Sequence, residues 1–180
     1  NGVIHGDNTD GPGFITDLKN NIGYNLNGKK ILLVGAGGAA RGVIPNILYQ
    51  LPSEFKIYNR TLEKAQKLAN VFKDIGEISS VKKEDLNKYN FDLIINATSI
   101  GISNSKFELS EIFFKEDAVC YDMSYGKASN SFMSWAKENN LQFYDGLGML
   151  LEQAADSFYI WEGERPEITD ELRKLLKNKL

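Results

Sequence analysis

The sequence predicts an α/β domain in which a doubly wound parallel sheet is covered by helices on both faces. Six short strand-like segments alternate with stretches whose apolar residues recur at helical spacing. The first segment, ILLV at 31–34, is a continuous apolar run, typical of a strand that is buried on both faces. A glycine-rich turn follows this segment and opens a helix. Because parallel crossovers are right-handed, the expected strand order is 3-2-1-4-5-6, as in the Rossmann fold.

Each element is placed by its apolar pattern and by its boundary residues. The strands are expected at 31–34, 55–59, 77–81, 92–97, 118–123 and 141–145. The helices are expected over roughly 11–22, from the glycine turn to Leu51, and over roughly 61–72, 129–139, 146–162 and 169–180. Thr61 and Thr169 are the expected N-caps of two of these helices. Pro45 should bend the helix that follows the glycine turn.

Composition argues against several classes of function. The formal net charge of −3 disfavours non-specific nucleic-acid binding, which needs a basic face. No apolar stretch approaches the ~20 residues of a membrane span, so no membrane partner is expected. The single cysteine, Cys120, cannot form an internal disulfide and reads as a buried strand residue, which favours a reducing, cytoplasmic location. No metal site is expected, and a homodimer stays open.

The glycine turn predicts a binding site for a dinucleotide. Its residues satisfy the pattern G-x-G-x-x-G/A, and they are Gly35, Ala36, Gly37, Gly38, Ala39 and Ala40. Gly35 permits the tight turn, Gly37 lets the backbone approach a pyrophosphate, and Ala40 lets the helix lie close to the strand. The phosphates then meet the free N–H groups at the helix start. A glycine-rich turn of another α/β protein is the alternative, but the strand before and the helix after the turn favour nucleotide binding.

The end of the second strand favours NADP(H) over NAD(H). Proteins that bind NAD usually place an acidic residue there, which bonds the ribose 2′-hydroxyl. Here the positions hold Asn59, Arg60 and Thr61, with Lys64 one turn further on. A guanidinium can bind a 2′-phosphate with two N–H bonds, whereas an acid would repel it. The alternative is that Arg60 is only a solvated surface residue.

Polar and glycine-rich segments collect where several strands end. DNTDG at 7–11 precedes the first helix, and read alone it could be a turn with an N-cap. NATSIGI at 96–102, YDMSY at 121–125 and DGLGMLLEQA at 145–154 follow the fourth, fifth and sixth strands. The carboxyl edge of an open α/β sheet is where ligands bind. These segments therefore predict a ligand site that faces the cofactor.

Together these motifs resemble the shikimate dehydrogenase family. The matching segments are NTDGPGF, GAGGAARG, NRT, FDLIINATSIGI, YDMSY and DGLGMLLEQAADSF, and they cover nearly the whole chain. The resemblance implies NADPH-dependent reduction of 3-dehydroshikimate to shikimate, in the route to aromatic amino acids. YGKASNSF at 125–132 departs from the family, in which many members carry proline and threonine, and this puts the conformation of that loop in doubt. The sole histidine, His5, matches no catalytic residue of the family and is expected in a turn.

The resemblance also assigns roles to residues. Asp10 matches the aspartate of the family's catalytic Lys–Asp pair. Asp10 and Asn8 are expected to contact the substrate, and Thr9 shares their turn. Gln153 and Tyr125 match residues that contact the substrate. The cofactor residues implied by the motifs and the resemblance are Gly35, Ala36, Gly37, Gly38, Ala39, Asn59, Arg60, Thr61, Lys64, Ala97, Thr98, Ser99, Gly146 and Met149. These types suit the chemistry, because hydride transfer to a ketone needs a proton at the oxygen and hydroxyl-rich substrates need polar partners.

The chain lacks part of what the family carries. It begins at Asn1 rather than Met, and no lysine in 1–180 matches the catalytic lysine, which the family places in an N-terminal substrate domain. We therefore expect 1–180 to be the NADP-binding domain of a longer protein, with helices over 146–180 that would pack on the absent domain. That predicts exposed apolar surface near Leu172, Leu175 and Leu176.

Three hypotheses about function follow. The first is that the parent is an NADP-dependent shikimate dehydrogenase and that the isolated chain binds cofactor without catalysis. The second is a quinate/shikimate relative with broader substrate choice or with NAD use. Arg60 argues only against NAD use, because the choice between quinate and shikimate is expected to lie mostly in the absent domain. The third is a regulatory or scaffold protein, which the presence of both Asp10 and Gln153 disfavours.

Overall fold

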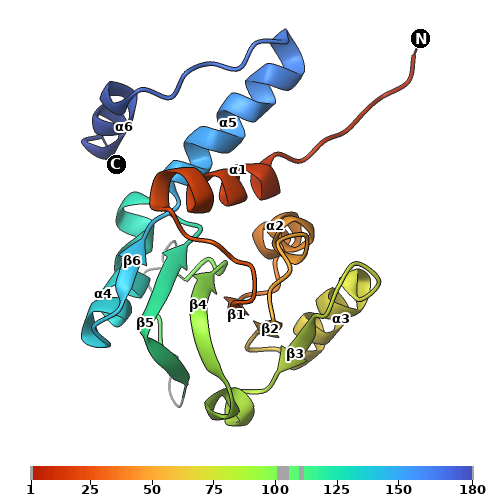
Figure 1. The fold of residues 1–180 in the computed structure, drawn as a ribbon, viewed down its shortest axis with the longest axis vertical. Helices are drawn as coiled ribbons and strands as arrows, with labels where there is room; N and C mark the ends of the chain where they lie inside the picture. Colours follow the sequence, from red (N-terminus) through yellow and green to blue (C-terminus); the bar gives the residue numbers. More distant parts are fainter. Residues whose placement is uncertain (1, 101–105, 110–111, 180) are drawn as a thin grey trace.

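A computed structural model describes residues 2–100, 106–109 and 112–179 of the chain. Its sheet contains six parallel strands in the order β3-β2-β1-β4-β5-β6 (Figure 1). The strands are β1 (Lys30–Val34), β2 (Glu54–Tyr58), β3 (Ser79–Val81), β4 (Asn90–Asn96), β5 (Phe113–Asp122) and β6 (Gln142–Tyr144). The predicted fold class and strand order are confirmed, with strand ends shifted by up to five residues.

Helices cover both faces of the sheet. One face packs on α1 (Asp10–Thr16), the π-helix η1 (Asp17–Ile22), α2 (Gly38–Leu48) and α3 (Leu62–Phe72). The opposite face packs on the 3₁₀-helix η2 (Lys83–Lys88) and on α4 (Asn130–Glu138), which the 3₁₀-helix η3 (Gly126–Ser129) precedes. Side chains alternate along β1, so that Ile31 and Leu33 join the first core whereas Leu32 and Val34 join the second. This alternation explains why the strand had to be apolar throughout.

Two details of the helices differ from the sequence predictions. Helix α2 continues through Pro45 and ends at Leu48. The placement of Leu51 on its apolar stripe was wrong: Leu51 adopts a left-handed conformation with φ of 56° and is 69% exposed. Thr169 caps its helix as predicted, because its Oγ1 accepts a hydrogen bond of 3.2 Å from the Leu172 amide. Thr61 is also the N-cap residue of α3, but its side chain makes no capping hydrogen bond.

The last two helices, α5 (Leu147–Glu162) and α6 (Asp170–Lys177), leave apolar side chains in solvent. Trp161, toward the end of α5, is 76% exposed, and Leu175 on α6 is 52% exposed. Leu172 and Leu176 are half-buried. The predicted apolar exposure on α6 is therefore confirmed at Leu175, while its cause, a domain that covers this surface, stays a prediction. Within the described residues, none of the helices has the length and apolar character of a membrane span.

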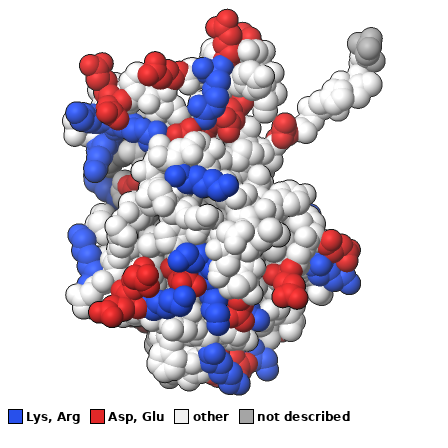
Figure 2. Space-filling model, viewed as in Figure 1, with Lys and Arg blue, Asp and Glu red and all other residues white. Residues whose placement is uncertain are grey.

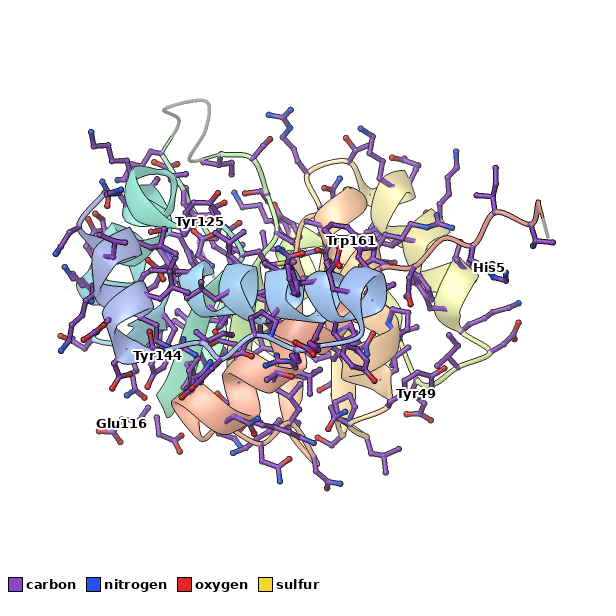
Figure 3. The ribbon with its side chains drawn as sticks, turned by 90° about the horizontal axis from the view of Figure 1, so that it is seen from above. His5, Tyr49, Glu116, Tyr125, Tyr144 and Trp161 are labelled. Atoms are coloured by element: carbon purple, nitrogen blue, oxygen red, sulfur yellow. The ribbon has the colours of Figure 1, made fainter. Side chains whose placement is uncertain are left out.

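Charges of both signs are interspersed on the surface. On the face drawn in Figure 2, lysine and arginine residues lie next to acidic residues around α6 and over the lower part of the molecule. The segment before α1 extends away from the body of the domain (Figure 1). His5 lies on this segment, exposed and outside any assigned turn (Figure 3).

Candidate active site

The carboxyl ends of β4 and β5 are held together by buried polar side chains. Asn96 Nδ2 donates a hydrogen bond of 3.0 Å to Asp122 Oδ2 between the two strand ends. Asn96 Oδ1 accepts from Thr98 Oγ1 at 2.7 Å, and Asp122 Oδ1 accepts from the Ser124 amide at 2.8 Å. These hydrogen bonds therefore fix the backbone where the chain leaves β4 and β5. Thr98 and Ser124, which follow these two strands, line a cavity.

The glycine turn after β1 is shaped by a close approach of backbone to backbone. Gly35 has φ of +114°, a conformation that side chains disfavour, and a Cβ there would lie 2.8 Å from the Ala97 carbonyl oxygen. The Gly35 amide donates to the Tyr58 carbonyl at 2.8 Å, which joins the turn to the end of β2. Helix α2 begins directly after Gly37. The turn therefore directs the start of α2 into the space above the strand ends.

A cavity of about 810 Å³ lies above these turns. It brings together twelve of the fourteen predicted cofactor residues, from three separate strand ends: Gly35, Ala36, Gly37, Gly38, Ala39, Asn59, Arg60, Thr61, Lys64, Ala97, Thr98 and Ser99. The other two, Gly146 and Met149, line a neighbouring cavity. The sequence-predicted residues thus converge on one region, and their individual roles stay predictions.

The residues that line the larger cavity suit phosphate groups. A Cβ on Gly37 would meet no atom within 4 Å, so the turn leaves open space beside the start of α2. Arg60 and Lys64 line the cavity, and among the described residues neither forms an ion pair. Phosphate groups favour both the free amides of a helix start and unpaired cations. The chemistry of this wall therefore suits a pyrophosphate and a further phosphate.

The smaller cavity, of about 240 Å³, adjoins the larger one. Two residues, Ala39 and Met123, line both cavities. The small cavity also receives five residues with predicted roles, namely Asp10, Tyr125, Gly146, Met149 and Gln153, together with Leu150. Tyr125 lies near the first turns of α5, at the end opposite Trp161 (Figure 3). A group in one cavity can therefore meet a group in the other at Met123.

The acidic turn before α1 is ordered by local hydrogen bonds. The Asp10 amide donates to Asn8 Oδ1 at 2.9 Å, and Thr9 Oγ1 lies 2.8 Å from Ser157 Oγ and 3.3 Å from Gln153 Oε1 on α5. No side chain of the described residues donates a hydrogen bond to the Asp10 carboxylate. Asn8 is exposed and lines neither cavity, so its predicted contact with substrate is unsupported by its position.

A charged network supports α5 from the side away from the small cavity. Glu152 is 4% exposed, and its carboxylate accepts hydrogen bonds from Arg165 at 2.7 Å and from Arg173 at 3.0 Å. Asn21 donates to the same carboxylate at 3.0 Å and to Asp17 at 2.7 Å. Asp17 in turn accepts from the hydroxyl of buried Tyr121 at 2.7 Å. The network fixes α5, and through it Met149 and Gln153, against the end of β5.

Burial changes the acidity of several groups near the strand ends. Burial raises the pKa of Asp122 to about 6, against the opposing effect of its hydrogen bonds from Ser124 and Asn96. It also raises the pKa of Asp17 and that of the Tyr121 hydroxyl, which bonds it. The pKa of the Cys120 thiol rises to about 12 by burial alone, so this cysteine is an inert core residue, as the sequence predicts.

Sequence reasoning missed several residues that line the cavities. Met123 was quoted in the YDMSY motif but given no role, although it lies where the two cavities meet. Lys106 and Glu108 also line the larger cavity, and they lie in a stretch without any motif. Only the strand-end position of Met123 could have indicated a contact. In the described part of the chain, no group of three or more His, Cys, Asp or Glu side chains could hold a metal ion.

Fold and site together define a domain of the Rossmann class, with a glycine-turn cavity at the carboxyl edge of a parallel sheet. The family described as shikimate / quinate 5-dehydrogenase matches residues 17–111, and the shikimate 5′-dehydrogenase C-terminal domain matches residues 146–177. The chain therefore belongs to the shikimate / quinate 5-dehydrogenase family, which confirms the resemblance found in its sequence.

Curated relatives and solved structures agree with this membership. The chain is 51% identical over 180 residues to shikimate dehydrogenase (NADP(+)) of Photobacterium profundum, covering 98% of this chain and 66% of the relative. Identity to the enzyme of the same name from Aeromonas salmonicida is 47% over 178 residues, covering 98% of this chain and 64% of the relative. The chain thus spans slightly less than two thirds of their length.

Solved structures with bound ligands share the fold. Shikimate 5-dehydrogenase of Thermus thermophilus, in complex with NADP(H) and shikimate, aligns with a TM-score of 0.74 at 31% identity, covering 89% of this chain and 58% of that one. The enzyme of Listeria monocytogenes, in complex with shikimate and NAD, aligns with a TM-score of 0.84 at 26% identity, covering 98% and 65%.

Proposed function

We propose that this chain is the cofactor-binding part of an NADP-dependent shikimate dehydrogenase, which reduces 3-dehydroshikimate to shikimate. The observation that carries the proposal is the junction of two cavities. One is lined by Arg60, Lys64 and the start of α2, and the other by the Gln153 amide and by the Asp10 carboxylate, which has no side-chain donor among the described residues. A cofactor in the first cavity and a hydroxylated ring in the second would meet at Met123. The names of the curated relatives and the ligands of the Thermus complex support the same pair of ligands.

NADP(H) is favoured over NAD(H) by the charge at the end of β2. Arg60 and Lys64 line the cavity there with Thr61, and no carboxylate follows Tyr58 on that turn. A 2′-phosphate would supply the charge that both cations lack among the described residues. A 2′-hydroxyl alone would leave them unpaired. The Listeria structure holds NAD, and titration of this chain with both dinucleotides measures its preference.

The chain's own residues would bind, orient and shield the reactants. When bound, NADPH supplies the hydride. The amides at the start of α2 would hold its pyrophosphate, and Met123, which lines both cavities, would shield their junction from water. The Asp10 carboxylate is an acceptor for a substrate hydroxyl, and the Gln153 amide is a second polar partner for the same ring. Each substrate hydroxyl that these groups satisfy avoids the cost of an unpaired buried polar group.

The chain as it stands is expected to bind cofactor without turnover. Reduction of a ketone needs a proton at the carbonyl oxygen, and the family resemblance assigns that proton to a lysine beside Asp10. The described residues that line the small cavity include no lysine and no histidine. The isolated chain is therefore a binding domain under this proposal.

The single cysteine favours a reducing compartment. Cys120 is buried and has no second cysteine with which to form an internal disulfide, which supports a location such as the cytoplasm.

Calorimetric titration with NADP⁺ and with NAD⁺ tests the proposal. We expect the chain to bind NADP⁺ more tightly than NAD⁺, and to show no reduction of 3-dehydroshikimate with NADPH. Arg60→Gln should weaken NADP⁺ binding by about tenfold to a hundredfold, because a charge-assisted bond to phosphate is lost. The same variant should change NAD⁺ binding by less than about threefold. Equal affinity for the two dinucleotides in the unaltered chain would remove the argument for NADP, and measurable turnover would show that the chain is catalytically complete.

A further inference from the structure

Residues 106–109 belong to no assigned helix or strand, and their side chains alternate between exposed and buried. Phe107 and Leu109 are buried, at 2% and 5% exposure, whereas Lys106 and Glu108 are exposed. Because burial alternates along the segment, Lys106 and Glu108 both lie on its solvent side, where their charged groups form an ion pair. The pattern therefore presents a cation and an anion together, away from the core.

The buried side of this segment is firmly packed. The Phe107 ring lies 4.6 Å from the Phe132 ring and 5.4 Å from the Trp135 ring, both on α4. The Phe107 amide also donates to Ser131 Oγ at 2.5 Å. Because α4 packs on the sheet, the segment is anchored to the core. Phe107 therefore anchors the segment, and its sequence neighbours Lys106 and Glu108 stay close to the cavity.

Both charged residues line the 810 Å³ cavity that also receives Arg60 and Lys64. Lys106 Nζ lies 3.8 Å from Glu108 Oε1, and the two side chains are 70% and 73% exposed. An exposed pair at this distance contributes little to stability, on the order of 0–1 kcal/mol. Among the described residues, Glu108 is the only carboxylate that lines this cavity. The pair therefore contributes little to stability, and it lies in the same cavity as Arg60 and Lys64.

We propose that Lys106 is a further phosphate contact for the dinucleotide, and that Glu108 is a competing partner that lowers its contribution. The inference rests on the proposed function, because it needs a phosphorylated cofactor in this cavity. A phosphate group carries more charge than a carboxylate and accepts several hydrogen bonds, so it displaces Glu108 from the ammonium. Glu108 then remains near the ligand as an uncompensated negative charge, which weakens binding.

Opposite effects of two single substitutions test this proposal. Lys106→Met should weaken NADP⁺ binding by about threefold to tenfold, because one exposed cation is removed from the phosphates. Glu108→Gln should strengthen it by about twofold to fivefold, because Lys106 loses its competitor and the ligand loses a repulsive neighbour. Both effects should become smaller when the salt concentration is raised from about 0.05 M to about 0.5 M, because the screening length falls roughly threefold. Calorimetric titration measures each.

Lys67→Met is the matched control. Lys67 is an exposed lysine on α3, one turn from Lys64, and it does not line the cavity. The substitution removes the same charge from the whole protein, so NADP⁺ binding should change by less than about twofold. A loss equal to that of Lys106→Met would show that only net charge matters, and would overturn the proposal.

NAD⁺ and NADP⁺ distinguish which phosphate Lys106 contacts. If the contact is the 2′-phosphate, Lys106→Met weakens NADP⁺ alone; if it is the pyrophosphate, both dinucleotides weaken equally. Either result supports a phosphate contact, whereas unchanged affinity for both overturns it. The unaltered chain separates this inference from the function on which it rests. Absence of NADP⁺ binding there would refute the cofactor proposal, while normal binding with an unchanged Lys106→Met variant would refute only the role of Lys106.

Discussion

Charged residues occur in two contrasting arrangements on the two sides of α5. On the side away from the small cavity, the Glu152 carboxylate is buried and accepts from two arginines and from Asn21. On the other side, the Asp10 carboxylate borders the small cavity without a side-chain donor among the described residues. Arg60 in the larger cavity is likewise without an ion pair in the described chain.

This contrast separates charges that stabilise the fold from charges that would bind a ligand under the proposed function. A buried charge without partners would cost several kcal/mol, so the Glu152 network had to be complete for the protein to fold. A charge at a cavity can remain unpaired because solvent hydrates it until a ligand arrives. Removal of a charge should therefore affect stability on the first side of α5 and binding on the second. Substitutions of Glu152 and Asp10 test this separation, and Asp122 at the end of β5 adds a buried carboxylate whose effect depends on pH.

The largest expected effect on stability is at Glu152. Glu152→Ala leaves Asn21 and two arginines without their shared acceptor, and it should lower the free energy of unfolding by about 2–4 kcal/mol. The cost stays below that of a fully buried pair, because Arg165 and Arg173 are 39% and 28% exposed and can reach solvent. Urea unfolding followed by circular dichroism measures the change.

Glu164→Ala is the matched control for this experiment. Glu164 is exposed and forms no ion pair within the described chain, so its removal should change the free energy of unfolding by less than about 0.5 kcal/mol. If the two alanine variants were equally stable, the Glu152 network would not be a structural element, and the contrast between the two sides of α5 would be lost.

An intermediate effect, dependent on pH, is expected at Asp122. An aspartate of the unfolded chain titrates near pH ~3.9, whereas burial raises the pKa of Asp122 in the fold to about 6. Between these values the folded protein holds a proton that the unfolded chain has lost, so the free energy of unfolding falls as pH rises through this window. Asp122→Asn removes this dependence because an amide does not titrate.

The difference between the two proteins isolates the contribution of Asp122. The stability of Asp122→Asn relative to the unaltered chain should rise by about 1–3 kcal/mol from pH ~4 to pH ~6.5. The lost acceptor for Asn96 adds an offset that does not vary with pH, and other titrating groups are common to both proteins. Urea unfolding at a series of pH values gives the difference, and a constant difference would mean that Asp122 titrates normally.

The smallest effect on stability is expected at Asp10. Asp10→Asn removes a carboxylate that has no side-chain donor among the described residues, so the free energy of unfolding should change by less than about 0.5 kcal/mol. The modest interaction of this charge with the start of α1 sets that limit. Thermal unfolding measures the shift. A loss comparable to that of Glu152→Ala would show that Asp10 is a structural charge, and would weaken its assignment to substrate.

The fold and much of the site could be predicted because their signals are local. The glycine turn, the NRT turn and the strand ends each lie within a few residues of a strand, and the parallel topology brings them to one edge. Contacts between distant segments gave no such signal. Arg173 donates a hydrogen bond to Asn21, 152 positions away, and Lys106 lines the cavity on a segment that Phe107 anchors to α4. Leu51 shows a different limit. Its apolar side chain matched the helical spacing, but the helix ends at Leu48 and the Leu51 backbone is left-handed.

Ala39 and Met123 line both cavities, so under the proposed function each would contact the nucleotide on one side and the substrate on the other. Any movement of Met123 that accommodates one occupant changes the walls seen by the other. By thermodynamic linkage, if the nucleotide changes the affinity for the substrate by some factor, the substrate changes the affinity for the nucleotide by the same factor. A substitution of Ala39 or Met123 that admitted a bulkier substrate would therefore also change the affinity for the nucleotide.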